Sequence, residues 1–243
     1  MEPDEDVVAE VVSAHRALAA AGQSDLVWGH AALRDPDGRG VWMKAAGFGL
    51  EEIGPAEVVL VSPEGEVLAG SGKRHIEFQI HAQVTRARPD VGAVVHTHAA
   101  SAVAFAALDV PLRPLSHDAV PFVDPDVVRF TRTGDLIRTA ALGAALAEAI
   151  GDTNGCLIPG HGLVTVGMDA AAAVMHAALL DRACRIALDA EAAGGPRRWS
   201  SEAEVASKRG GVWNATQLRA GYRYLVRRAD ELYGPVAAST PSA

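Results

Sequence analysis

Three histidines in two short segments of this chain have the spacing of a metal site. His96 and His98 lie one residue apart at the end of an apolar run, and because side chains alternate along a strand they point to the same face. His161 stands between two glycines in the segment 159–162, where the backbone can turn sharply. Three neutral imidazoles bind a divalent transition metal and leave coordination positions open for a substrate. The spacing therefore predicts a catalytic metal, and these ligand types accept Zn, Mn, Fe or Co.

A fourth candidate ligand is Glu77, in a segment that the apolar spacing of Ile76, Ile80 and Val84 predicts to be a helix. A carboxylate beside a metal can serve as a labile ligand and as a general acid or base. Taken alone, Glu77 has the simpler interpretation of an exposed helix glutamate. His81 follows it at i+4 on the same helix face, and we expect it to support the site rather than to bind the metal.

Length and composition are those of an ordinary globular chain, with 243 residues, 49% hydrophobic and 21% charged. A chain of this size can bury a substantial core, and we expect one domain over residues 1–234 and a disordered tail over 235–243. The formal net charge of −8 favours neither nucleic acid nor an anionic membrane as a partner. No stretch has the length and hydrophobicity of a membrane span.

The two cysteines, Cys156 and Cys184, lie far apart, and the acidic N-terminus lacks the features of a signal peptide. This usage predicts reduced thiols in a cytoplasmic protein. Cys156 is close in sequence to His161 and could be a nucleophile, but a small buried apolar role is the favoured interpretation.

Apolar periodicity and turn residues predict strands that alternate with helices, which is typical of an α/β fold. We expect helices at 5–21, 76–87, 101–108, 133–150, 170–193 and 216–232, with a helical turn at 55–57. The expected strands are 26–34, 41–45, 58–61, 67–68, 91–97, 155–158 and 163–166. The segment 194–211 is the most loop-like internal region.

Taken together, these motifs resemble the class II aldolase/adducin family, from about Glu5 to Glu191. The likeness rests on the Glu77 helix, the segment 88–91 that leads into the paired histidines, and the segment 160–167 around His161. An early motif, Trp28-Gly29-His30 followed by Leu33-Arg34-Asp35, is also similar to that family.

The resemblance implies a three-layer α/β/α fold with a largely antiparallel central sheet. It implies a metal held by His96, His98 and His161, with Glu77 as the catalytic carboxylate near it. Members of the family are commonly homotetramers whose active sites lie at subunit interfaces. His117 falls in the region where family members reach toward the pocket, which makes it a candidate substrate-binding residue.

The chain departs from the family's sugar-phosphate enzymes at two places that decide the substrate. Those enzymes have an asparagine after the early glycine and two serines before the catalytic glutamate, and these groups cradle a phosphate. Here the positions hold His30 and the pair His75-Ile76. Because isoleucine offers no hydrogen bond to a phosphate oxygen, a phosphorylated sugar is disfavoured.

Cationic residues stand in place of the phosphate cradle. Lys73, Arg74 and His75 precede the helix of Glu77, and a helix N-terminus already favours anions. An arginine can hold a carboxylate with two hydrogen bonds, so the substrate is expected to carry a carboxylate. Lys73 and Arg74 can instead be surface loop charges, and His30 can be either an active-site acid or a packed histidine.

These observations lead to a metal-dependent carbon–carbon lyase that decarboxylates an aromatic ortho-hydroxy carboxylate or dicarboxylate, such as a dihydroxyphthalate-like compound. In this hypothesis Arg74 or His75 binds the second carboxylate, and Glu77 or His30 supplies the proton that replaces carbon dioxide. A class II aldolase of a non-phosphorylated hydroxy-keto substrate is the first alternative. A non-catalytic adducin-like scaffold is the second, although such a scaffold would be expected to have lost its metal ligands.

Overall fold

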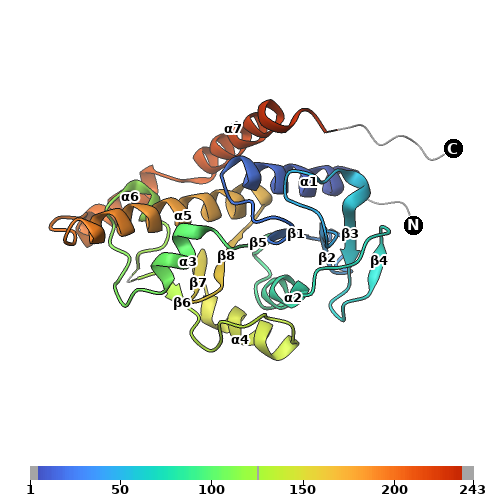
Figure 1. Cartoon of the computed structure of the whole chain (residues 1–243), viewed down its shortest axis with the longest axis horizontal. Helices are drawn as coiled ribbons and strands as arrows, with labels where there is room; N and C mark the ends of the chain where they lie inside the picture. The colour runs from blue at the N-terminus through green and yellow to red at the C-terminus, as the bar shows by residue number, and fades with distance from the viewer. Residues whose placement is uncertain (1–4, 125, 237–243) are drawn as a thin grey trace.

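A single mixed sheet runs through the centre of the protein (Figure 1). The computed structural model describes residues 5–124 and 126–236, and most of the expected tail lies outside these residues. The order across the sheet is β4-β3-β2-β1-β5-β8-β7-β6, and every neighbouring pair is antiparallel except β6 and β7. The strands are β1 (His30–Arg34), β2 (Val41–Lys44), β3 (Val58–Val61), β4 (Val67–Ala69), β5 (Ala93–Thr97), β6 (Val128–Arg129), β7 (Gly155–Ile158) and β8 (Gly162–Gly167).

Helices cover both faces of this sheet, which confirms the expected three-layer α/β/α architecture with a largely antiparallel centre (Figure 1). On one face lie α1 (Glu5–Ala20), α3 (Ala100–Ala106) and α5 (Ala170–Ala192), with α7 (Ala215–Tyr233) packed over α1 and α5. The other face carries α2 (Phe78–Ala87) and α4 (Ala140–Ile150). The remaining elements are α6 (Glu202–Gly211) and the short 3-10 helices η1 (Pro55–Glu57) and η2 (His117–Ala119).

The alternation of side chains along β5 decides which helical layer will meet the paired histidines. Ala93 and Val95 belong to the core beneath α1 and α5, whereas Val94 belongs to the core beneath α2 and α4. His96 is two residues beyond Val94 and therefore shares the α2 face of the sheet.

The packing of α2 against α4 positions the carboxylate of Glu77. Gly143 of α4 lies so close to α2 that a Cβ atom there would stand 2.6 Å from the carbonyl oxygen of Gln79. Glu77 occupies the N-cap position of α2, and Ile80 and Val84 are fully buried in the core of this face. The prediction that the helix starts at Ile76 was wrong, since Ile76 precedes the cap and is 49% exposed.

Three further expectations about local structure need correction. The strand expected from Leu26 begins only at His30, because Leu26 and Gly29 have positive φ values and turn the chain before it. The helix expected from residue 133 begins at Ala140, because the Thr139 side chain accepts a hydrogen bond from the backbone N–H of Leu142 and caps it there. The segment expected to be a loop at 194–211 contains α6, whose N-terminus is a capping box between Ser201 and Glu204.

His15 of α1 is a structural histidine that joins the helix to the sheet. Its Nδ1 donates to the carbonyl of Val11 at 2.7 Å, and its Nε2 accepts from the backbone N–H of Ala31 at 2.9 Å. Complete burial, opposed by the Val11 hydrogen bond, lowers the pKa of His15 to about 3. The folded protein therefore holds His15 as a neutral imidazole.

This arrangement predicts a loss of stability in acid. A histidine whose pKa is depressed in the folded state takes up its proton preferentially on unfolding, so its contribution falls as the pH drops below about 6.5. At pH 5 the loss from one such group is roughly 2 kcal/mol. Denaturant melts of metal-free protein between pH 7 and 5 measure this effect. The free energy of unfolding should fall less steeply with decreasing pH in His15→Gln than in the parent. The matched change His117→Gln, at an exposed position, should leave the slope unchanged; equal slopes in all three proteins would contradict the prediction.

Candidate metal centre

Four side chains predicted as metal ligands converge at one end of strands β5 and β8. His96 lies in β5, His98 directly follows that strand, His161 precedes β8 and Glu77 caps α2. One ligand atom from each of the four lies within 4.8 Å of the others. The donor set is three imidazoles and one carboxylate, which is typical of a site for a divalent transition metal.

Strand register and one glycine make this convergence possible. Residues 93–97 of β5 pair with 163–167 of β8, so the turn before β8 arrives beside the end of β5. At Gly162 a Cβ atom would lie 2.4 Å from the carbonyl oxygen of Thr97 and 3.0 Å from the ring of His98. Only a residue without a side chain permits this approach, which explains why a glycine must follow His161.

The imidazoles present free nitrogens to one another. The Nε2 atoms of His96, His98 and His161 are buried and have no hydrogen-bond partner among the described residues. The Nδ1 of His96 donates to the carbonyl of Leu163 at 2.9 Å, and the Nδ1 of His98 donates to the Asp25 carboxylate at 2.8 Å. These bonds leave a lone pair on Nε2, which is the form that a metal requires. Buried polar atoms without partners are costly unless a ligand satisfies them, so the site fits a metal ion.

Glu77 contributes an ionised carboxylate to the cluster. Its oxygens lie 3.5 Å from Nε2 of His161 and 3.7 Å from Nε2 of His96, and one of them accepts a hydrogen bond from the backbone N–H of Ile137 at 2.7 Å. Burial alone would raise the pKa of Glu77, but His161, His96 and the Ile137 N–H outweigh it and bring that pKa down to about 2.

A second group of histidines lies directly beside the first. His30 of β1 is the cross-strand partner of His96, and their ring centroids are 5.2 Å apart. His30 Nδ1 forms a hydrogen bond with His81 Nε2 at 2.5 Å, and its ring lies 4.1 Å from that of His75. Burial lowers the pKa of all three, that of His75 to about 4, so their rings are neutral. His30 Nε2, His75 Nδ1 and His81 Nδ1 have no partner among the described residues.

Lys44 is a residue of this region that the motifs did not reveal. It ends β2, is fully buried, and donates from Nζ to the carbonyls of Val27 at 2.8 Å and Phe48 at 2.7 Å. Burial, partly offset by two glutamates, lowers the pKa of Lys44 to about 8. Its charge adds to the effect of burial on the pKa of His30, of His75 and of His15 of α1. A lysine inside an otherwise apolar strand was the available signal.

The other predicted substrate-binding residues are not gathered around the cluster. The Arg74 guanidinium donates to the carbonyl of Gly65 at 2.7 Å and lies 4.2 Å over the ring of Phe78, which holds it against the turn between β3 and β4. Lys73 is exposed. His117 is exposed in η2, where its carbonyl accepts a hydrogen bond from the Trp213 indole at 2.9 Å.

Cys156 has no catalytic features. It is fully buried in β7, and burial raises the pKa of its thiol to about 12. A reactive cysteine needs a lowered pKa and access to solvent, so the expectation of a packed apolar residue fits the structure.

Comparison with known proteins agrees with this fold. Residues 9–188 match the model of the Class II Aldolase and Adducin N-terminal domain, and the chain belongs to this family. The relatives include decarboxylases and aldolases, which are lyases.

Three similar proteins indicate the range of that family. Decarboxylase NovR of Streptomyces niveus is 36% identical over 163 residues, which cover 66% of this chain and 60% of that protein. A 3,4-dihydroxyphthalate decarboxylase of a Terrabacter species is 31% identical over 208 residues, covering 76% of this chain and 81% of the relative. The L-fuculose 1-phosphate aldolase structure from Glaciozyma antarctica superposes with a TM-score of 0.81 at 27% identity, covering 94% of this chain and 90% of the other.

In the described residues, no helix is long and apolar enough to cross a membrane.

The contact between Asp25 and His98 leads to a prediction about metal affinity. Removing a carboxylate that orients a histidine ligand typically costs about 10–100-fold in metal binding. Titration of the metal-free protein with Co²⁺, followed by its visible spectrum, should show such a loss for Asp25→Ala. Asp37→Asn, a change at an exposed aspartate, should bind Co²⁺ like the parent. An unchanged dissociation constant in Asp25→Ala would exclude an orienting role for this carboxylate.

Proposed function

We propose that this protein is a metal-dependent carboxy-lyase that acts on an aromatic ortho-hydroxy carboxylate or dicarboxylate of the dihydroxyphthalate kind. The observation that carries the proposal is the buried group of His30, His75 and His81 beside the metal ligand His96. These residues offer unpartnered ring nitrogens to a substrate. Two relatives, the 3,4-dihydroxyphthalate decarboxylase and decarboxylase NovR, also support decarboxylation as the reaction.

The four converging side chains would hold the metal. A divalent ion bound by His96, His98 and His161 supplies a Lewis acid that stabilises negative charge on a substrate oxygen. Glu77 remains close to two of the imidazoles, and its hydrogen bond from the Ile137 N–H fixes the direction of its carboxylate. Glu77 therefore lies where it can bind the ion or exchange a proton with the substrate.

The substrate's second carboxylate is assigned to His75 and Arg74. His75 has a buried and unpartnered Nδ1, and an imidazole N–H at that atom can donate to an anion. Arg74 can join it only by releasing the carbonyl of Gly65, and Lys73 contributes to the positive charge from the surface.

Decarboxylation breaks the bond between the ring and the carboxylate carbon, and the electron pair stays on the ring carbon. A proton must then reach that carbon while carbon dioxide leaves. His30 is held in one orientation by its hydrogen bond to His81, and its Nε2 has no other partner among the described residues. His30 is therefore the group that we assign to the proton transfer. Its Nε2 takes the proton of the substrate's ring hydroxyl and delivers it to the ring carbon, and the phenolate left on the product then takes a proton from water.

The rim of the site suggests how the protein assembles. Several segments near the site carry exposed apolar side chains. Those next to site residues are Leu26, Val27 and Trp28 after Asp25, Ile76 before Glu77, and Leu136 before Ile137. Phe48, whose carbonyl accepts from Lys44, is also exposed. Exposed apolar side chains around a site are typical of an interface. In a homotetramer with interfacial sites, His117 of one copy would meet the site of another.

A carbon dioxide release assay tests the reaction. Metal-free protein should be inactive with 3,4-dihydroxyphthalate and related hydroxylated aromatic acids, and Mn²⁺, Fe²⁺, Co²⁺ or Zn²⁺ should restore turnover. His96→Ala should abolish both metal binding and turnover. Carbonyl products without carbon dioxide would select the aldolase alternative, which the Glaciozyma structure supports. Failure to bind any of these metals would support the scaffold alternative instead.

The role of His30 is tested separately by His30→Asn. A general acid contributes about 10²–10⁴-fold to the rate, so kcat should fall by this factor while the metal dissociation constant and KM change little. Steady-state kinetics and Co²⁺ titration of the same preparations measure these quantities. If Glu77 is the proton donor, Glu77→Gln will remove turnover and His30→Asn will retain it, which would refute the assignment.

A further inference from the structure

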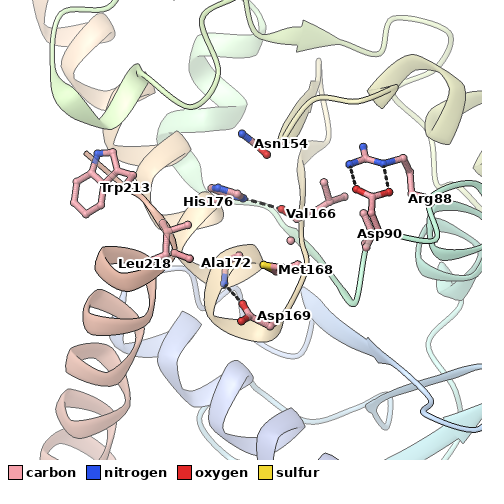
Figure 2. Close-up of a pocket in the computed structure, with 13 residues that line it drawn as sticks. Arg88, Asp90, Asn154, Val166, Met168, Asp169, Ala172, His176, Trp213 and Leu218 are labelled. Carbon is pink, nitrogen blue, oxygen red and sulfur yellow. Dashed lines mark hydrogen bonds and ion pairs between the residues drawn. The ribbon is translucent and has the colours of Figure 1, made fainter. Parts of the chain in front are cut away.

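A pocket of about 420 Å³ lies at the opposite end of β8 from the metal centre (Figure 2). It is formed where β8 ends at Gly167, where α5 begins after Asp169, and where α7 begins with Ala215. The six residues of β8 separate it from His161 by roughly 17 Å along the strand. Its volume falls within the range of about 300–1,000 Å³ that small-molecule sites occupy.

A buried histidine reaches this pocket with one nitrogen unused. His176 of α5 lines the pocket, is only 6% exposed, and contacts the carbonyl of Val166 through Nδ1 at 2.7 Å (Figure 2). Its Nε2 has no hydrogen-bond partner among the described residues. Because a carbonyl can only accept, Nδ1 must carry the proton. Burial lowers the pKa of His176, so the ring is neutral and Nε2 is a free acceptor.

The charged side chains that line the pocket are paired within the described part of the chain. Arg88 forms two hydrogen bonds with Asp90, at 2.8 and 2.6 Å (Figure 2). Asp169 accepts from the backbone N–H of Ala172 at 2.9 Å and pairs with Arg219 at 3.2 Å. No charge is left over to attract an ion, so the lining suits a neutral ligand.

A second acceptor and an aromatic surface complete the lining. Asn154 donates from Nδ2 to the carbonyl of Pro121 at 3.0 Å, which leaves its side-chain oxygen free to accept. Trp213 lines the pocket at a φ of +58°, a strained value for a residue with a side chain. Its indole is fixed by a hydrogen bond to the carbonyl of His117. With Leu218 and Met168, it gives the pocket an apolar wall.

We propose that this pocket is a second ligand site, which binds a small neutral aromatic molecule carrying a hydroxyl or N–H donor. The donor bonds to Nε2 of His176, and the ring lies against the wall that includes Trp213 and Leu218. The free atom at His176 is an acceptor, which favours a ligand that carries a donor. This inference does not depend on the proposed reaction.

The test uses phenol as the probe and the full chain in its metal-free form, so that binding at the metal centre is removed. Isothermal titration should give one site for phenol. Toluene, which has the same ring and no donor, should bind about tenfold more weakly, because one hydrogen bond is worth about 1.5 kcal/mol. Benzoate should not compete, because the pocket offers no unpaired cation. Equal affinities for phenol and toluene, or no phenol binding, would overturn the proposal.

Two variants on the same helix locate the site. Ala215→Trp fills the pocket from an exposed position at the start of α7 and should abolish phenol binding. Ala220→Trp is the matched control, since Ala220 is also exposed on α7 and does not line the pocket, and it should bind phenol normally. His176→Phe, in protein shown to fold by circular dichroism, should bind phenol and toluene equally. Phenol binding that survives Ala215→Trp would show that the ligand binds elsewhere.

Discussion

The pairing of β5 with β1 on one side and β8 on the other is the constraint on which the site depends. It sets His30 opposite His96 and brings the turn that carries His161 alongside His98. Because side chains alternate along a strand, a shift of one residue in this register would turn His96 to the other face of the sheet. The close approach of Gly162 to the Thr97 carbonyl helps to keep the register in place, since any larger residue would separate the two strands.

The polar cluster built on this register costs stability in the absence of a ligand. The unpartnered Nε2 atoms of His96, His98 and His161 have lost their hydrogen bonds to water. A ligand that binds only the folded state stabilises it by mass action. Metal binding and folding of this chain are therefore expected to be linked, because the groups that weaken the apo protein are those that the ion would satisfy.

The sequence predicts those parts of the fold and the site whose signal lies within one short segment. The spacing of His96 and His98 fixes their common face, so this half of the site needed no tertiary information. Asp25 gave no such signal, because it lies in a loop that meets His98 only in the fold. The start of α4 was missed for a similar reason: Thr139 caps the helix, and the segment before it extends so that the Ile137 N–H can reach Glu77.

At each end of β8 a backbone carbonyl orients a histidine, but the two histidines suit different ligands. At one end the carbonyl of Leu163 fixes Nδ1 of His96, and at the other the carbonyl of Val166 fixes Nδ1 of His176. In both cases a sheet carbonyl sets the tautomer and leaves the lone pair of Nε2 for a ligand. At the first end His96 joins two further imidazoles and a carboxylate, a set that suits a divalent cation. At the second end His176 is the single free imidazole of the pocket, among paired charges and beside an indole, so the same lone pair suits a neutral hydrogen-bond donor.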